Sequence, residues 1–287
     1  MLFILKNLAY CKILTNFATK IHFPHKNIWN NRYMNKKISV VINTYNAEKD
    51  LARVLESVKE FDEIVICDME STDSTLEIAK QYNCKIVTFP KKNYTIVEPA
   101  RQFAIDSASY KWVLLVDADE IVTKELHDYL YNAIEKSNCP AGLFIPRKNY
   151  FMGRLYNYPD YQMRFFVKEG TVWPPTIHSR PTIPGRVDYL PKKYKKLALV
   201  HLANDSISSR LQKTNIYTEN EVRKRAHKHY TTLNLIFSPI WRFLFRYFFG
   251  GGIKNGKAGY INAILEGFYK FVTIAKIIEK ERSHDIR

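Results

Sequence analysis

Residues 113–121, which read V-L-L-V-D-A-D-E-I, decide the fold. The first four are apolar and branched, as in a strand buried inside a parallel sheet. Three carboxylates follow directly: Asp117, Asp119 and Glu120. Like charges this close repel one another unless a positive group lies among them. The stretch therefore predicts a buried strand whose carboxyl end meets a positive group.

The chain before this stretch alternates apolar strands with amphipathic helices. We expect strands at 38–42, 63–67 and 85–89, and helices at 47–61, from Ser71 and at 99–108. Strands separated by helices form βαβ units and a parallel sheet, which binds ligands beyond the carboxyl ends of its strands. Residues 145–202, rich in aromatics and prolines, predict mixed strands and loops, and the chain from about Ser206 onward predicts helices.

The composition is that of a basic globular protein. Its 287 residues are 46% hydrophobic, which suffices for a core and excludes a disordered chain. The net charge of +16 indicates an anionic partner, which is nucleic acid, an anionic membrane surface or a phosphorylated substrate. The four cysteines form no C-x-x-C pair, so we expect a reduced, cytosolic protein.

The Asp117-x-Asp119 pair has two readings. Carboxylate oxygens suit Mg²⁺ or Mn²⁺, and a metal held by few carboxylates shares its other positions with substrate phosphates. Alternatively, the pair lies in a solvated turn, and Asp119 caps a helix at 124–136. D-x-D alone does not decide between them.

Polar residues also follow the other strands. The loop at 43–48 is either an ordinary turn or a nucleotide contact through Thr44. Asp68 can accept a hydrogen bond from the imide N–H of uracil, whereas Asp73 is better placed to cap a helix. Arg101 is either a solvated helix residue or a planar donor to phosphates.

Together these residues resemble the family 2 glycosyltransferases of the GT-A fold. Order and spacing match across residues 37–122. The matching motifs are Thr44-Tyr45-Asn46-Ala47-Glu48, the D-x-x-S-T-D turn from Asp68 to Asp73, Ala100-Arg101 and Asp117-Ala118-Asp119. Looser matches at 158–166, at Trp173 and His178, and at 199–202 resemble lipopolysaccharide or lipooligosaccharide core β-1,4-glucosyltransferases. Where relatives often carry an acid after the histidine, this chain has Ser179.

The resemblance implies an α/β fold with a Rossmann-like, mostly parallel sheet and an inverting sugar transfer. The donor would be UDP-glucose, and the acceptor a hydroxyl of a lipid-linked saccharide such as the lipopolysaccharide inner core. Mn²⁺ or Mg²⁺ would bind at Asp119, with His201 as a further ligand, and Asp117 would be catalytic. The implied substrate-binding residues are Thr44, Tyr45, Asn46, Glu48, Asp68, Arg101, Asp117, Arg164 and His178. Either histidine also has a purely structural reading.

Inversion needs a base on the far side of the sugar from the leaving group. No Glu-Asp pair follows the D-A-D motif, so we expect Asp160 to be this catalytic base, with Glu169 and Asp188 as alternatives. Arg164, four positions after Asp160, either orients it or contacts phosphate.

The last part of the chain is basic and aromatic. Residues 222–265 hold eight Lys or Arg and no acid. The apolar run at 233–249 is interrupted by Pro239, Arg242 and Arg246, which argues against a membrane span. The two arginines share one helical face, so we expect an amphipathic helix with its cations toward anionic lipid. The alternative is a core helix with its arginines in water.

We therefore expect an N-terminal extension (1–36), a glycosyltransferase domain (37–202) and a helical, membrane-associating tail (203–287). In the domain, 37–122 would bind the nucleotide sugar and 123–202 the acceptor. The extension is either without structural role or a short amphipathic surface helix.

The expected location is the cytoplasmic face of the inner membrane, with the protein bound peripherally. We do not expect nucleic acid as a partner. Two alternatives stay open. One is a glycosyltransferase with another nucleotide sugar or acceptor, and the other is a non-catalytic membrane- or RNA-binding protein of the same fold.

Overall fold

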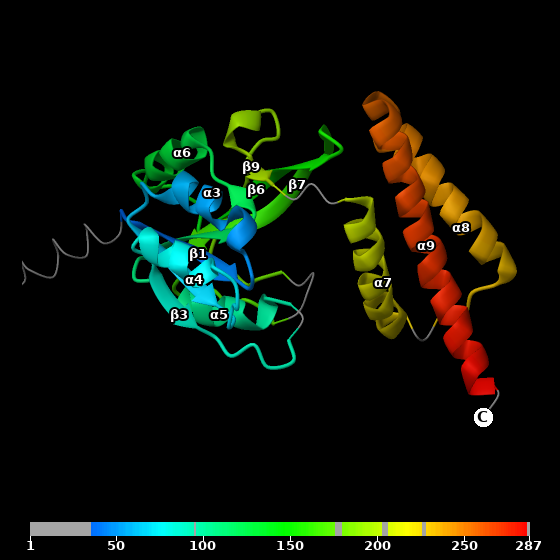
Figure 1. Ribbon diagram of the computed structural model, residues 1–287. Helices are drawn as coiled ribbons and strands as arrows, with labels where there is room; N and C mark the ends of the chain where they lie inside the picture. The colour runs from blue at the N-terminus through cyan, green and yellow to red at the C-terminus, as the bar shows by residue number, and fades with distance from the viewer. Residues whose placement is uncertain (1–35, 95, 176–179, 203–205, 226–227, 286–287) are drawn as a thin grey trace, which may run out of the picture.

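The computed structural model describes residues 36–94, 96–175, 180–202, 206–225 and 228–285 (Figure 1). A mixed sheet flanked by helices forms one part of the molecule, and three helices form the other. The two predictions for the N-terminal extension and the role predicted for His178 fall outside the described residues.

The first half of the sheet is parallel, as the alternating pattern predicts. Its strands are β1 (Ile38–Thr44), β2 (Glu63–Asp68), β3 (Lys85–Thr88) and β4 (Trp112–Asp117), in the order β3-β2-β1-β4. Every residue of β1 is buried, because β1 lies between β2 and β4 and has helices on both faces. All four strands end at the same edge of the sheet.

Helices α3 (Glu48–Val58), α4 (Thr75–Gln81) and α5 (Glu98–Asp106) connect these strands. Helix α3 turns Leu51, Val54, Leu55 and Val58 to one face of the sheet, which is the apolar stripe that its sequence predicts. Helix α5 packs Ala100, Ala104 and Ile105 on the other face. The core therefore lies in two layers, one on each side of the sheet.

The second half of the sheet is mixed. It contains β5 (Glu120–Ile121), β6 (Gly142–Phe151), β7 (Arg154–Val167), β8 (Val187–Tyr189) and β9 (Leu199–His201), with α6 (Lys124–Ile134) and the 3-10 turn η1 (Lys195–Leu197) between them. Strand β7 runs antiparallel to both β4 and β6, because a tight turn at Met152-Gly153 joins it to β6. The expected sheet is confirmed, with an antiparallel insertion after β4.

Helix α6 is capped by Thr123, whose side chain accepts from the Leu126 amide. Asp119 is therefore not its cap. Strand β9 instead pairs antiparallel with β5, with Glu120 opposite His201. This pairing brings the end of the predicted acceptor half to the acidic loop after β4.

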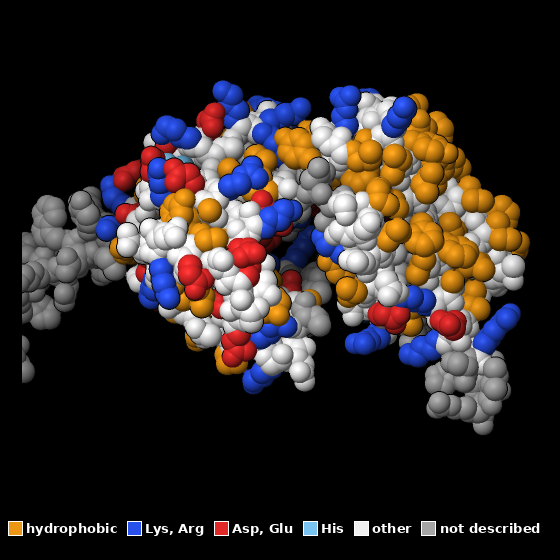
Figure 2. Space-filling view, in the orientation of Figure 1, with side chains coloured by type: hydrophobic (Ala, Val, Ile, Leu, Met, Phe, Trp, Pro, Cys, Tyr) orange, Lys and Arg blue, Asp and Glu red, His pale blue; other side chains and the backbone are white. Residues whose placement is uncertain are grey.

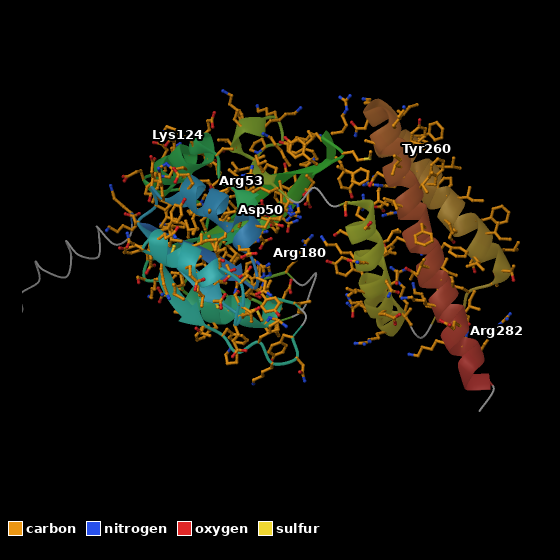
Figure 3. The ribbon with its side chains drawn as sticks, in the orientation of Figure 1. Asp50, Arg53, Lys124, Arg180, Tyr260 and Arg282 are labelled. Atoms are coloured by element: carbon orange, nitrogen blue, oxygen red, sulfur yellow. The ribbon has the colours of Figure 1, made fainter. Side chains whose placement is uncertain are left out.

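The C-terminal region is helical, as predicted. Helices α7 (Ile207–Lys224), α8 (Thr232–Leu244) and α9 (Gly256–Asp285) follow one another, with the π-helical turn η2 (Phe245–Phe249) and the 3-10 turn η3 (Gly252–Asn255) before α9. Tyr260 and Arg282 mark the two ends of α9 in Figure 3. No helix among the described residues is both long and apolar enough to span a bilayer.

The glycines at 250–252 end η2 and allow the chain to reverse. Gly251 has φ +77°, and a Cβ on Gly259 would lie 1.9 Å from the Gly252 carbonyl oxygen. Helices α8 and α9 consequently form a tight hairpin. The helices contact the tip of the β6–β7 hairpin, where Asn255 Nδ2 donates to the Leu155 carbonyl oxygen at 3.1 Å.

Candidate active site

The predicted strand-end residues meet at the carboxyl edge of the parallel strands. Thr44 of β1 is in register with Asp68 of β2, and Asn43 of β1 is in register with Asp117 of β4. Because parallel strands run in the same direction, their carboxyl ends lie at one edge of the sheet. The sequence therefore brings Thr44, Asp68 and Asp117 to that edge, as the βαβ argument predicts.

Asp68 is buried and anchored by its neighbours. Its Oδ1 accepts from Thr44 Oγ1 (2.9 Å) and Ser71 Oγ (2.6 Å), and its Oδ2 accepts from the Ser71 amide (2.9 Å). A carboxylate has about four acceptor positions, so Asp68 keeps capacity for one more donor. The structure thus holds Asp68 in place and makes Thr44 its partner.

The loop after β1 is joined to the loop after β2. The Asn46 side chain accepts from the Thr72 amide (2.8 Å), and the Glu48 side chain accepts from the Ser74 amide (3.0 Å). Tyr45 is exposed and lies under the Lys91 ammonium, 4.3 Å from the ring centre. Asn46 and Glu48 therefore hold the two loops together, and their predicted contact with a nucleotide stays a prediction.

Asn43 is a residue that the sequence argument treated only as a turn former. Its side chain is 8% exposed, and neither Nδ2 nor Oδ1 has a hydrogen-bond partner within the described part of the chain. A buried amide without partners costs about 1–3 kcal/mol. Beside it, burial and Asp68 raise the pKa of the Cys67 thiol to about 12, so this thiol is no nucleophile.

Asp117 lies among guanidinium groups. Arg101 Nη2 donates to its Oδ1 (3.1 Å), Arg164 donates to both of its oxygens, and Arg147 Nη1 lies 3.8 Å from its Oδ2. Burial raises the pKa of Asp117, but Arg164 and Arg101 lower it by more, so the pKa lies well below its usual range. The positive neighbours of this aspartate are thus arginines of the protein itself.

Glu120 supplies the second anion of this cluster. It is fully buried, and its Oε1 accepts from Arg164 Nη2 (2.7 Å) and Arg147 Nη1 (3.0 Å). Its Oε2 accepts from the Asp117 backbone amide (3.1 Å). Glu120 therefore fixes the D-A-D loop and two arginines at once. The sequence argument left Glu120 without a role and missed Arg147, because only the pairing of β6 with β7 brings that arginine here.

Asp119 faces His201, as the predicted metal site requires. His201 Nε2 lies 3.1 Å from Asp119 Oδ2, and His201 Nδ1 lies 2.8 Å from Asn149 Oδ1. An amide oxygen only accepts, so Nδ1 carries the proton. In a neutral imidazole, Nε2 is then an acceptor that faces a carboxylate acceptor. This arrangement needs a proton or a metal cation between the two atoms.

The donor set fits a metal that shares its shell with substrate. The Asp119 and His201 side chains are 38% and 21% exposed, so a ligand can reach them. Among the residues the structure describes, no group of three or more His, Cys, Asp or Glu side chains could hold a metal ion. The protein would therefore supply two ligands here and leave the other positions to phosphate oxygens or water.

Asp160, the predicted base, is already engaged. Its Oδ2 accepts from Arg147 Nη2 (2.7 Å) and Asn149 Nδ2 (2.9 Å), and its Oδ1 accepts from Gln162 Nε2 (2.9 Å). Burial raises the pKa of Asp160, but Arg147 and these hydrogen bonds lower it by more. A base must gain a proton, and these contacts oppose that gain. The role of Asp160 stays a prediction that its surroundings do not favour.

The other candidates for the base lie apart. Glu169 follows β7, whose Val167 pairs with Trp112 at the opposite edge of the sheet, so Glu169 does not face the site. Asp188 is exposed and pairs with Arg186 at 3.3 Å. Arg164 contacts Asp117 and Glu120, and Arg147 takes the position beside Asp160 that we predicted for Arg164.

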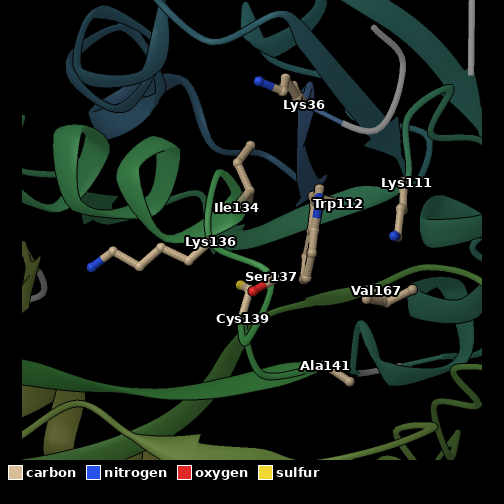
Figure 4. A pocket seen from close by; sticks show the side chains of 9 residues that line it. All are labelled: Lys36, Lys111, Trp112, Ile134, Lys136, Ser137, Cys139, Ala141 and Val167. Carbon is tan, nitrogen blue, oxygen red and sulfur yellow. The ribbon is translucent and has the colours of Figure 1, made fainter. Parts of the chain in front are cut away.

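A separate pocket of 340 Å³ opens at the amino-terminal edge of β4 (Figure 4). Lys36, Lys111, Trp112 and Cys139 are among the residues that line it. Because Trp112 begins β4 and Asp117 ends it, this pocket is not part of the site.

Comparisons with known proteins identify the family of the chain. The chain matches the model of the glycosyl transferase family 2 over residues 39–183. An uncharacterized glycosyltransferase of Rickettsia typhi is 29% identical over 258 residues, which are 85% of this chain and 87% of that protein. The lipopolysaccharide core biosynthesis glycosyltransferase LpsC of Rhizobium meliloti is 26% identical over 265 residues, or 85% and 92% of the two chains.

Among solved structures, Staphylococcus aureus TarS 1–349 in complex with UDP is similar, with a TM-score of 0.45 and 18% identity over 86% of this chain and 92% of that one. The family model covers half of the present chain, including the strand-end residues from Thr44 to Asp119. The chain is a glycosyltransferase that belongs to family 2 and has the GT-A fold.

Proposed function

We propose that this glycosyltransferase transfers a sugar from a nucleoside diphosphate to an acceptor hydroxyl at the carboxyl edge of β1, β2 and β4. The observation that carries the proposal is the facing pair Asp119 and His201, whose Oδ2 and Nε2 atoms lie 3.1 Å apart. They lie beside Asp117 and a cluster of arginines, where a diphosphate would find both a metal and guanidinium donors.

The donor is UDP-glucose in this proposal. Asp68 keeps room for one further donor, and the imide N–H of uracil supplies one. The joined loops of Tyr45 and Asn46 border this position. Arg101, whose guanidinium lies 5.6 Å from the ring centre of Trp173, is held where it can also donate to a phosphate.

A divalent cation bound at Asp119 and His201 would neutralise charge that develops on the diphosphate as the sugar leaves. An imidazole nitrogen among the ligands favours Mn²⁺ over Mg²⁺, which prefers oxygen. The contribution of the chain is positional. Glu120 and Arg164 fix Asp117, and Asn149 fixes the His201 ring with Nε2 toward the site.

The acceptor is a lipid-linked saccharide, with the inner core of lipopolysaccharide as our proposal. The similarity to LpsC supports this class of acceptor. The net charge of +16 fits an acceptor that carries phosphate and is held at an anionic membrane. We accordingly propose that the protein works at the cytoplasmic face of the inner membrane, with residues 203–287 in contact with lipid.

A donor screen tests this function. The purified protein is incubated with a panel of nucleotide sugars and Mn²⁺ or Mg²⁺, and release of the nucleoside diphosphate is followed by chromatography. We expect release of UDP from UDP-glucose with Mn²⁺, faster when a lipooligosaccharide acceptor is added, and none with Asp119→Ala. If no nucleotide sugar is consumed with either metal, the chain is instead a non-catalytic member of its family.

A further inference from the structure

The α8–α9 hairpin, residues 232–285, has an unusual distribution of polar and apolar side chains. Helix α8 and the turn η2 are rich in Phe, Ile, Leu and Trp, yet neither has a buried residue. More than half of the large apolar side chains that are exposed within the described residues lie on this hairpin. Figure 2 shows them as one orange surface over the side that faces away from the sheet.

The exposed side chains form two parallel stripes. On α8 and η2 the stripe includes Phe237 (62% exposed), Trp241 (67%) and Phe248 (52%). On α9, Ile264 and Phe268 are also exposed, four residues apart on one face. Because the helices pack side by side, the stripes join into one convex surface. An exposed apolar surface of this extent marks an interaction site.

The arginines of α8 and η2 have partners within the protein. Arg242 donates to Glu266 through Nε (3.1 Å) and Nη2 (2.7 Å), and Arg246 lies 5.5 Å from the ring centre of Tyr156 on β7. Arg210 of α7 donates to Asn262 (2.6 Å). We predicted that both arginines would face lipid. For Arg242 of α8 this stays a prediction, because its side chain is 47% exposed and lines one pocket with Phe237 and Trp241. Arg246 of η2 instead turns toward β7.

The part of the hairpin that carries the two stripes, residues 233–271, is poor in acids. Between residues 222 and 278 the only acid is Glu266, which is 17% exposed and paired with Arg242. Lys254 and Lys257 are exposed beside the hairpin turn. A surface of Phe, Ile and Trp with lysines at its end, and with the exposed carboxylate of Glu279 only beyond the stripes, matches the boundary between head groups and acyl chains of an anionic bilayer.

We propose that the α8–α9 hairpin inserts its outer apolar face into the head-group and acyl boundary of an anionic bilayer. This inference deepens the membrane contact proposed above and rests on it. Insertion is driven by removal of Phe and Trp surface from water, and the lysines add attraction to anionic lipid. Helix α8 lies in the plane of the membrane, because 13 residues with Pro239 among them are too short to span it.

Flotation with vesicles of phosphatidylcholine and phosphatidylglycerol tests the proposal. We expect the protein to float with the vesicles at about 0.1 M NaCl and also at about 1 M NaCl. High salt screens the attraction between charges but does not weaken the burial of apolar side chains. Brominated lipids should quench Trp241 fluorescence, a signal that Trp241→Phe removes. The double variant Trp241→Glu with Phe237→Glu should bind vesicles at least about tenfold more weakly.

The matched control is Tyr189→Glu, which changes a side chain of similar exposure (51%) on the catalytic domain. It should float like the wild type. Binding that 1 M NaCl abolishes and the double variant retains would overturn insertion. A wild type that ignores vesicles but dimerises in ultracentrifugation, with a monomeric double variant, would show that a second copy covers this face.

A UDP-release assay without lipid tests the active site independently of vesicle binding. UDP release from UDP-glucose in the absence of lipid should be the same in the wild type and in the double variant, because the substitutions lie on exposed residues far from Asp119 in the fold. Loss of vesicle binding with unchanged UDP release counts for insertion and for the donor site. A wild type that floats but releases no UDP would overturn only the proposed function.

Discussion

His201 Nε2 lies 3.1 Å from Asp119 Oδ2, although 82 residues separate the two along the chain. The short pairing of β5 with β9 produces this contact, and the Leu202 amide secures it by donating to the Asp119 carbonyl oxygen (2.7 Å). Because Nδ1 of the ring donates to Asn149, the contact between Nε2 and Asp119 needs a proton or a metal cation between the two atoms.

Asn149 positions the histidine, and its removal should weaken metal binding. We expect Asn149→Ala to lower the Mn²⁺ affinity of the UDP complex about 10- to 100-fold, as loss of a group that orients a ligand does. Mn²⁺ titration followed by calorimetry measures this, and UDP affinity without metal should stay unchanged. Lys148→Ala, the neighbour on β6, is the control and should bind Mn²⁺ like the wild type. Equal Mn²⁺ affinity in both variants would contradict the role of Asn149.

Glu120 holds the arginine cluster together, so its loss should cost stability. Glu120→Gln keeps the shape of the side chain but leaves Arg164 and Arg147 short of one negative charge. Breaking a buried ion pair in this way costs about 3–5 kcal/mol. Urea titration measures the free energy of unfolding. The control Glu125→Gln alters an exposed pair with Lys196 (3.7 Å) and should change the free energy of unfolding by less than about 1 kcal/mol. Similar losses in both variants would contradict this account.

Asp160 should contribute to stability in a pH-dependent way. Burial raises the pKa of Asp160 and Arg147 lowers it by more, so the pKa lies below the unfolded value of about 3.9. The stabilisation is therefore complete above about pH 5 and is lost as the pH falls through the lowered pKa. Asp160→Asn should flatten the decline of the unfolding free energy from pH 5 toward acid. Parallel curves for the wild type and Asp160→Asn would reject the lowered pKa.

Asp68 should make the site selective for uracil over cytosine. The carboxylate accepts from the imide N–H of uracil, but it repels the acceptor nitrogen of cytosine, to which an amide can donate. We expect Asp68→Asn to lower the ratio of UDP affinity to CDP affinity about 3- to 10-fold, which is the effect of losing one hydrogen bond. Calorimetric titration with both nucleotides gives the ratio. Asp73→Asn, a change in the same loop, should leave it unaltered, and an unchanged ratio in Asp68→Asn would place the base elsewhere.

The sequence predicts the parallel half of the sheet well, because buried strands and amphipathic helices leave clear periodic patterns. Strand ends then follow from geometry, so Thr44, Asp68 and Asp117 meet as predicted. The antiparallel half is harder, since the partners of β6 and β9 depend on long-range pairing. For that reason Arg147 and Asn149 were missed, although both reach the site.

The arginines show a second limit of sequence reasoning. Periodicity places Arg242 on α8 and Arg246 one turn later in η2, but it does not say what either side chain contacts. We predicted that both turn to lipid because isolated amphipathic helices lie on membranes with their cations at the head groups. The deciding partners are Glu266 on α9 and Tyr156 on β7, which tertiary packing supplies.

The central claim is that Asp119 and His201 bind a divalent cation together with the diphosphate of the donor. Calorimetric titration of UDP into the wild type and into Asp119→Ala, each with and without Mn²⁺, tests it most directly. We predict that Mn²⁺ raises the UDP affinity of the wild type at least about tenfold and leaves that of the variant unchanged. A wild type that binds UDP equally well with and without Mn²⁺ would contradict the account.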